Sequence, residues 1–180
     1  MRKAGFGLAF WLAFCLTPCL AGAAPAAMTD AANGFYHAYE GLASASGLPD
    51  AKARAHLEPF VSPALERALA AAATAQKQFL AANKAAPPLL EGDIFTSNFE
   101  GATAFKVGVC STDAKAGHCT IALAYEEKGG AKALRWTDML YLVKTEEGWR
   151  VDDIGYGGHW SFANQGRLRA TLAMVTAMAR

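Results

Sequence analysis

The side chain best suited to chemistry, Asp138, lies inside a long apolar segment. Hydrophobic residues alternate with other residues from 133 to 144, which predicts a β-strand. The face that carries Asp138 is the more apolar of the two and holds Leu134, Trp136, Leu140 and Leu142. A carboxylate is costly to bury among such neighbours unless it is paired, and desolvation raises its pKa. Asp138 is therefore the best candidate for a general base.

A base in this position needs a neighbour with which it can exchange a proton. Three side chains are candidates for that neighbour: Tyr36, His37 and His159. We take Asp138 and His159 as the candidate catalytic residues. A simpler alternative places Asp138 near a strand end or a bulge, where it pairs with Arg135 or Arg150. If the protein only binds a ligand, an Asp138→Asn change is expected to leave its stability nearly unchanged.

A second pair of carboxylates, Asp152 and Asp153, lies in a predicted strand over 149–154. Neighbouring strand residues point to opposite faces, so the two carboxylates are not expected to share one proton or one metal ion. Asp153 has the phase of Trp149 and Val151 and is expected to face inward. The simplest interpretation leaves one of the two in solvent and pairs the other with backbone or an arginine.

The segment 155–160 contains three glycines and invites comparison with a phosphate-binding loop. The third glycine of a GxGxxG pattern would fall on Trp160, and no Lys-Ser or Lys-Thr pair follows the glycines. We interpret the segment as a turn whose tyrosine, histidine and tryptophan form a rim for a ligand or a protein. The ligand contacts expected in the whole chain are Tyr36, Trp136, Tyr156 and His159.

Two cysteines, Cys110 and Cys119, end one predicted strand and begin the next. Antiparallel pairing of these strands brings the cysteines together, so we expect a disulfide that stabilises the fold by roughly 2–3 kcal/mol. The alternative is a metal site that also uses His118. That site lacks a CxxC pair and a fourth nearby ligand, so no metal and no cofactor are expected.

The first residues have the order of a secretory signal peptide. Arg2 and Lys3 precede an apolar run over 6–20, and small residues follow over 21–27. We expect a signal peptide over 1–24 and one domain over 25–180, located in the periplasm or secreted. Removal of the peptide takes Cys15 and Cys19 with it and leaves no membrane span. A retained membrane anchor and lipid modification of Cys19 are the alternatives.

Length and charge narrow the classes of function. The chain has 180 residues and a formal net charge of +1 at pH 7, with 53% hydrophobic residues. These values fit one globular domain and argue against a disordered chain. The near-neutral charge provides no strongly basic surface, so nucleic acid is not an expected partner.

Hydrophobic periodicity predicts helices first and strands later. The expected helices are 29–46, 50–57, one from Ser62-Pro63 to the stop at Pro87-Pro88, and 164–178. Their expected N-caps are Thr29 or Asp30, Asp50 and Ser62. The expected strands are 94–99, 102–110, 119–127, 133–144 and 149–154, with turns at Gly129-Gly130 and Glu146-Glu147-Gly148. Short connections between strands favour antiparallel pairing.

This order predicts an α+β fold in which the N-terminal helices pack on a curved antiparallel sheet, with a helix at the C-terminus. The stretch from Gly148 to Ile154, GWRVDDI, resembles the last strand of domains with the nuclear transport factor 2-like (cystatin-like) cone. The export signal, the paired cysteines and the Ile154-Gly155-Tyr156 run resemble a family of exported bacterial proteins on that fold. The resemblance implies the fold but carries no established activity to this chain.

Three functions remain open. The first is an exported, non-catalytic domain that binds a small molecule, a peptide or a protein. The second is a small dehydratase, isomerase or hydrolase with Asp138 as its general base. The third is a periplasmic protein that neutralises a toxin. An exposed sheet face with Met139, Tyr141 and Val143 would in addition suit a homodimer.

Overall fold

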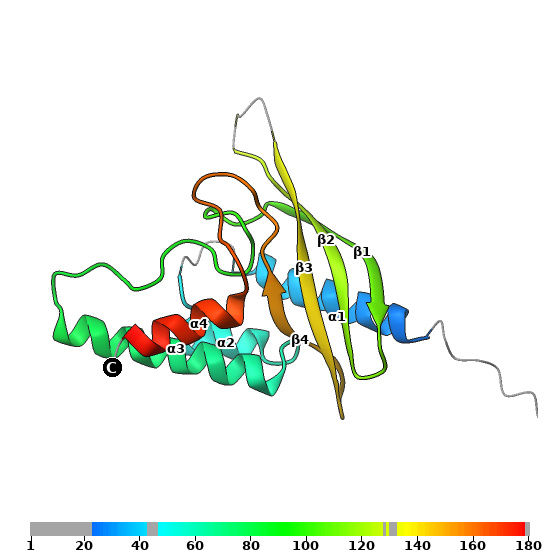
Figure 1. Ribbon diagram of the computed structural model, residues 1–180, viewed down its shortest axis with the longest axis horizontal. Helices are drawn as coiled ribbons and strands as arrows, with labels where there is room; N and C mark the ends of the chain where they lie inside the picture. The colour runs from blue at the N-terminus through cyan, green and yellow to red at the C-terminus, as the bar shows by residue number, and fades with distance from the viewer. Residues whose placement is uncertain (1–22, 43–46, 128, 130–132, 179–180) are drawn as a thin grey trace, which may run out of the picture.

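The computed structural model describes residues 23–42, 47–127, 129 and 133–178. Within these ranges the chain forms four helices and one four-stranded antiparallel sheet, which confirms the α+β class (Figure 1). The helices are α1 (Ala23–Glu40), α2 (Ala51–Leu57), α3 (Pro63–Ala82) and α4 (Leu168–Met178). The strands are β1 (Ala104–Thr112), β2 (Ala116–Tyr125), β3 (Leu134–Thr145) and β4 (Gly148–Gly155), paired in the order β1-β2-β3-β4.

Two of the predicted helix starts are confirmed by their caps. Asp50 accepts a hydrogen bond from the backbone N–H of Ala53 at 2.8 Å and begins α2. Ser62 accepts one from Leu65 at 3.0 Å and begins α3, with proline in the first turn. The expected start of the first helix at Thr29 or Asp30 is wrong. Thr29 lies inside α1, where its hydroxyl donates to the Pro25 carbonyl one turn earlier at 3.0 Å.

The segment 94–99, expected as a strand, is a loop. The Asp93 carboxylate accepts hydrogen bonds from the backbone N–H groups of Phe95 at 2.8 Å and Thr96 at 2.7 Å. These bonds curl the chain and use donors that a sheet ladder would need. The last helix likewise begins later than residue 164, because Asn164 is used in a contact between loops and its N–H donates to the Ser97 carbonyl at 2.8 Å.

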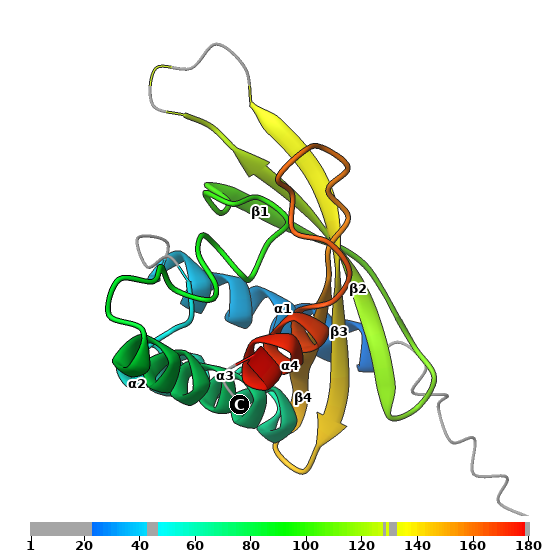
Figure 2. The same cartoon turned by 60° about the vertical axis from the view of Figure 1, so that its left-hand side comes forward.

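Helix α1 runs across one face of the curved sheet and contacts β1, β2 and β4 (Figure 2). Helices α3 and α4 pack side by side at the β4 edge. The predicted inward face of β3 is confirmed, since Trp136, Asp138, Leu140 and Leu142 are all buried. The sheet therefore encloses its core between the strands and α1, and Asp138 belongs to that interior.

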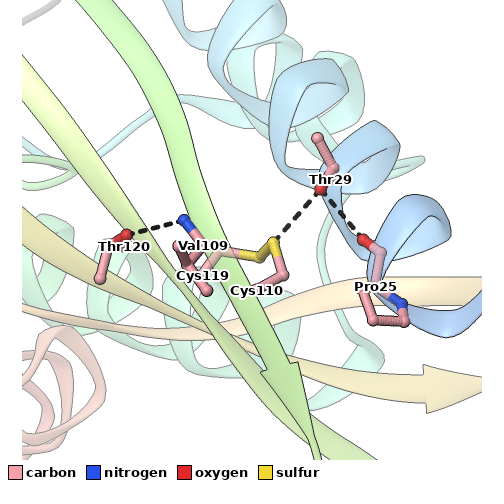
Figure 3. The surroundings of a disulfide bond; sticks show 6 residues. All are labelled: Pro25, Thr29, Val109, Cys110, Cys119 and Thr120. Carbon is pink, nitrogen blue, oxygen red and sulfur yellow. Dashed lines mark hydrogen bonds between the residues drawn. A yellow bond between two sulfur atoms is a disulfide. The ribbon is translucent and has the colours of Figure 1, made fainter. Parts of the chain in front are cut away.

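The predicted disulfide between Cys110 and Cys119 is present, and the two residues are direct partners across β1 and β2. A register shift between Val107 and Cys110 precedes it, and the Val109 N–H donates to the Thr120 hydroxyl at 3.1 Å. The Thr29 hydroxyl lies 3.4 Å from Cys110 Sγ (Figure 3). The disulfide thus lies where α1 meets the β1–β2 pair, and it excludes the alternative metal site built on the same cysteines.

The expected signal peptide lies outside the described residues, apart from Ala23 and Ala24, which belong to α1. Cys15, Cys19, Gly130 and the expected helix end at 43–46 also lie outside them. Of the helices that the structure describes, none has both the length and the apolar character needed to cross a membrane. The turn at Glu146 and Glu147 before β4 is confirmed.

Candidate functional site

Asp138 is a buried carboxylate on β3 that accepts hydrogen bonds from three other residues. Only 1% of its surface is exposed. Its Oδ2 accepts from the Ser97 N–H at 2.8 Å and from the Trp136 indole N–H at 3.1 Å. Its Oδ1 accepts from the Gly157 N–H at 2.8 Å and from the Ser97 hydroxyl. Four donors therefore balance the buried carboxylate, as its burial requires.

Neither arginine proposed as a partner of Asp138 is used in that way. Arg135 lies 3.5 Å from Glu126 at the surface, and Arg150 donates to the Trp149 carbonyl. The alternative in which Asp138 pairs with Arg135 or Arg150 is wrong. Two loops reach the buried face of β3 and supply backbone N–H and hydroxyl donors to Asp138 instead. A catalytic role for Asp138 stays a prediction, and the geometry itself gives this residue a positioning role.

Ser97 joins the two loops that meet at Asp138. We call residues 93–101 the first loop and residues 156–166 the second loop. The Ser97 hydroxyl, which donates to Asp138, also accepts from the N–H groups of Gly157 at 3.0 Å and Gly158 at 2.9 Å. One side chain of the first loop thus fixes two successive peptide groups of the second loop.

The glycines of the second loop are required by close packing. A Cβ at Gly157 would overlap the Thr137 carbonyl oxygen on β3. A Cβ at Gly158 would come within 2.8 Å of the Ser97 Cβ. The absence of side chains lets the backbone N–H groups reach the carboxylate and the serine hydroxyl. The Gly-Tyr-Gly-Gly run is therefore a packing motif, in line with the failed phosphate-loop pattern.

Asn164 adds a second connection between the loops. Its side-chain amide donates to the Asp93 carbonyl at 2.7 Å and to the Thr96 carbonyl at 2.8 Å. Figures 1 and 2 show the segment between β4 and α4, in orange, beside the green segment that precedes β1. The loops hold one another with several hydrogen bonds, which fixes their relative position before any ligand arrives.

Behind the loops lies a cluster of tyrosines around Asp93, of which Tyr36 and Tyr39 are buried and Tyr156 is partly buried. Burial raises the pKa of the Asp93 carboxyl to about 6. Burial and the nearby Asp93 also raise the pKa values of Tyr39 and Tyr156 well above the ordinary tyrosine value. The Tyr39 hydroxyl accepts from the Ala102 N–H at 3.0 Å, and the Tyr156 hydroxyl donates to the Ile94 carbonyl at 2.7 Å. These tyrosines support the base of the first loop in their neutral form.

Tyr36 lies deeper in the same cluster and is fully buried. Its ring stacks on Phe105 at 5.1 Å between centroids and meets Phe35 edge-on. Its hydroxyl has no hydrogen-bond partner among the described residues. Burial, followed by the charge of Asp138, raises the pKa of this hydroxyl. Tyr36 is therefore part of the core and does not reach the surface to contact a ligand directly.

Of the other residues expected at the site, Trp136 lies beside Asp138, whereas the two histidines are exposed. Trp136 is buried, and its ring meets that of Trp160 edge-on at 5.6 Å between centroids. His159 is exposed on the second loop. His37 lies on the exposed side of α1 and pairs with Glu40 at 3.1 Å. The fold brings Trp136 to Asp138 and Tyr156 to the first loop, whereas His37 is engaged elsewhere.

Asp153 is buried, with 7% of its surface exposed, and is paired with an arginine and a backbone N–H as expected, although a bulge in β4 shifts the register there. Asp153 lies opposite Tyr141, while Leu142 lies opposite Val151, so the register shifts by one residue. The bulge interrupts the strict alternation after Val151, yet Asp153 stays buried.

Both carboxylates hold the start of α4. Asp152 accepts from the Ser62 hydroxyl at 2.5 Å and pairs with Arg169 at 2.7 Å. Asp153 pairs with Arg167 at 2.8 Å and accepts from the Arg169 N–H at 2.9 Å. Because Arg169 contacts both, the two carboxylates act together as a structural clamp on this helix.

The outer end of the two loops carries two phenylalanines that the sequence analysis missed, beside Trp160, which it expected in a rim. Phe99, from the first loop, is 48% exposed, and Phe162, from the second loop, is 91% exposed. Both line a hollow of about 440 Å³ whose other lining residues are Asn98, Glu100, Trp160 and Ser161. We call these six residues the aromatic tip. The sequence did contain a sign of these exposed side chains, because aromatic residues occur within the short stretches Ser-Asn-Phe-Glu and Trp-Ser-Phe.

The part of the chain that the structure describes has no group of three or more histidine, cysteine or acidic side chains arranged to hold a metal ion. Comparison with models of protein families, with curated proteins and with solved structures finds no match to this chain. The function therefore has to be argued from the site itself.

Proposed function

We propose that this protein is a non-catalytic binding module that recognises its ligand through the aromatic tip. The observation that carries the proposal is the exposure of Phe162, a large apolar side chain that the fold leaves 91% accessible. Together with the half-exposed Phe99 and with Trp160 it surrounds one hollow. Exposed aromatic side chains grouped around a concavity are typical of binding sites.

The backbone at Phe162 supports this proposal. Its φ is +70°, a left-handed conformation that is unfavourable for a bulky residue other than glycine. Strain of this kind persists where the surrounding structure imposes it, and it gathers at binding sites. The neighbouring Ala163 N–H donates to the Trp160 carbonyl, which closes the turn that projects Phe162 outward.

Asp138 serves this surface indirectly. Its four hydrogen bonds fix Ser97, Trp136 and Gly157, and Trp136 in turn packs against Trp160 of the tip. A ligand that meets such a prearranged surface loses less free energy to the ordering of loops. The role that we propose for Asp138 is therefore to position the tip.

We further propose that the protein is exported and that its curved sheet and helices are a form of the nuclear transport factor 2-like cone. The disulfide supports export, because disulfides persist in oxidising compartments. The sheet packed on α1 supports the cone. A homodimer and a toxin-neutralising role stay predictions.

The proposed function is tested with a panel of small neutral, cationic and anionic aromatic or aliphatic compounds. Binding is detected by saturation-transfer NMR on the wild type and on Phe162→Ala. Val109→Ala is the matched control, because Val109 is also an exposed apolar residue, 77% accessible, on β1. We expect Phe162→Ala to lose the panel's signals and Val109→Ala to keep them. Equal signals in the wild type and both variants would show that the tip is not the binding surface.

A further inference from the structure

We infer that the ligand of the aromatic tip presents an organic ammonium cation, of the alkylated or quaternary type. This inference rests on the proposed function and specifies the chemistry that the tip selects. The basis is the combination of three aromatic rings with a single carboxylate around one hollow.

The charge among the residues that line the hollow is negative. Among the described residues that line the hollow, Glu100 alone is ionisable, and it is exposed. Asn98 and Ser161 add polar groups without charge. A negative group at a concave surface favours a positive ligand and repels an anionic one. A fatty acid, a phosphate or an acidic peptide is therefore a poor match for this surface.

The aromatic rings favour a particular kind of cation. The faces of Phe99, Trp160 and Phe162 carry negative partial charge, which attracts an ammonium group and most strongly one that sheds its water easily. Alkylated ammonium groups are large and weakly hydrated, and clustered aromatic rings are the surroundings in which proteins bind them. The hollow of about 440 Å³ is within the range of small-molecule sites and exceeds what a single methylated ammonium group fills.

Two of the three rings are held in place before binding. The Phe99 ring lies directly on Gly92, where any added Cβ would overlap it. Trp160 packs over Gly158 and meets Trp136 edge-on. The loops beneath them are joined through Ser97 and Asn164. Two of the three rings therefore have a fixed orientation, and Phe162 is the ring with the most freedom to close on a ligand.

The test compares choline with 3,3-dimethylbutan-1-ol, a neutral compound of the same shape, at constant ionic strength. Chemical shifts of the Trp160 indole and of the amides in both loops are followed by NMR during titration. We expect choline to bind with a Kd on the order of 1 mM, and the neutral compound to bind roughly tenfold more weakly.

Two charge variants make the test specific. Glu100→Gln is expected to weaken choline binding about three- to fivefold and to leave the binding of the neutral compound unchanged. Glu91→Gln is the matched control, because Glu91 is an exposed carboxylate just before the first loop that does not line the hollow. Phe162→Ala is expected to weaken choline binding by a similar factor. Both Glu100 and Phe162 are exposed, so these variants are expected to fold normally.

The outcomes separate this inference from the proposed function. If both compounds shift the loop resonances with equal affinity, the cation inference is wrong while the tip stands as a binding surface. If choline shifts resonances elsewhere only, or none, the cation inference is also wrong, and the compound panel then decides whether the tip binds anything. If Glu91→Gln weakens choline binding as much as Glu100→Gln does, the effect is one of general charge and contradicts a site at Glu100.

Discussion

Ser97 and Asp138 lie 41 residues apart in the chain, yet the Ser97 N–H donates to the Asp138 carboxylate at 2.8 Å. The serine hydroxyl donates to the other carboxylate oxygen. This double contact attaches the first loop to β3, and through the same hydroxyl the second loop joins it. A buried acid that resembles a catalytic base in the sequence is thus the anchor of a loop surface.

Replacing Asp138 with asparagine is expected to destabilise the fold by about 2–4 kcal/mol. The asparagine side chain replaces one accepting oxygen by an NH₂ group, which faces N–H or O–H groups that donated to the carboxylate. We therefore no longer expect the nearly neutral change in stability that the sequence suggested. Chemical denaturation measures the loss, with Thr137→Val at an exposed neighbouring position as control. An unfolding free energy within about 0.5 kcal/mol of the wild type would contradict the anchoring role.

Gly157→Ala is expected to cost more stability than Gly166→Ala, although both lie in the second loop. The new Cβ at 157 would overlap the Thr137 carbonyl oxygen, and the backbone must move away from Asp138. Gly166 has open space around it and only a φ of +75° to oppose a side chain, which costs roughly 1–2 kcal/mol. Thermal unfolding ranks the stability of the two variants. If Gly166→Ala were the less stable variant, close packing of the loop on β3 would be refuted.

The raised pKa of Asp93 leads to a specific pH dependence. The folded state holds a proton on this carboxyl up to about pH 6, whereas its ordinary pKa is 3.8. Folding therefore binds a proton between these values, and stability falls as the pH rises through this window. Asp93→Asn keeps an acceptor for Phe95 and Thr96 and removes the titration.

We expect the free energy of unfolding of Asp93→Asn, relative to wild type, to increase by about 2–3 kcal/mol from pH 4 to pH 7. Urea denaturation at several pH values measures it. The comparison isolates this group, because every other titrating residue is common to the two proteins. A constant difference across this pH range would show that Asp93 ionises normally in the fold.

Replacing both Cys110 and Cys119 with alanine is expected to destabilise the protein by roughly 2–3 kcal/mol. The disulfide joins residues nine positions apart at the place where α1 meets β1. Chemical denaturation should show the same loss of unfolding free energy for the variant and for the reduced wild type. A free-thiol assay that found both cysteines reactive in the untreated native protein would contradict the disulfide itself.

Local patterns in the sequence predicted the features that depend on neighbouring residues. The caps at Asp50 and Ser62 followed from their position before helical stretches. The inward face of Asp138 followed from the alternation along β3. The Cys110–Cys119 pair followed from two alternating segments with a short connection. Each of these depends only on one helix or strand and its flanking residues, or on two strands joined by a short connection.

The features that were missed depend on side-chain hydrogen bonds to nearby backbone, on a bulge, or on contacts between distant segments. The first loop replaces an expected strand because Asp93 captures two N–H groups, and nothing in the hydrophobic pattern shows this. The register shift between Tyr141 and Leu142 was also missed, because no residue type in the sequence signals the bulge in β4. The partners of Asp138 come largely from loops whose approach is fixed by the whole fold, so the sequence identified the buried carboxylate but not the groups that bind it.

The most direct test of the account is to titrate compounds of the panel that bind into the folded wild-type protein and to map the changes in its amide chemical shifts. The account predicts shifts concentrated in residues 97–101 and 158–163, around Phe99, Trp160 and Phe162. A competing hollow of about 680 Å³ lies between the start of α1 and the β3–β4 turn and includes Asp30, Phe60 and Trp149. Shifts confined to that hollow, with the loops unchanged, would contradict the central claim.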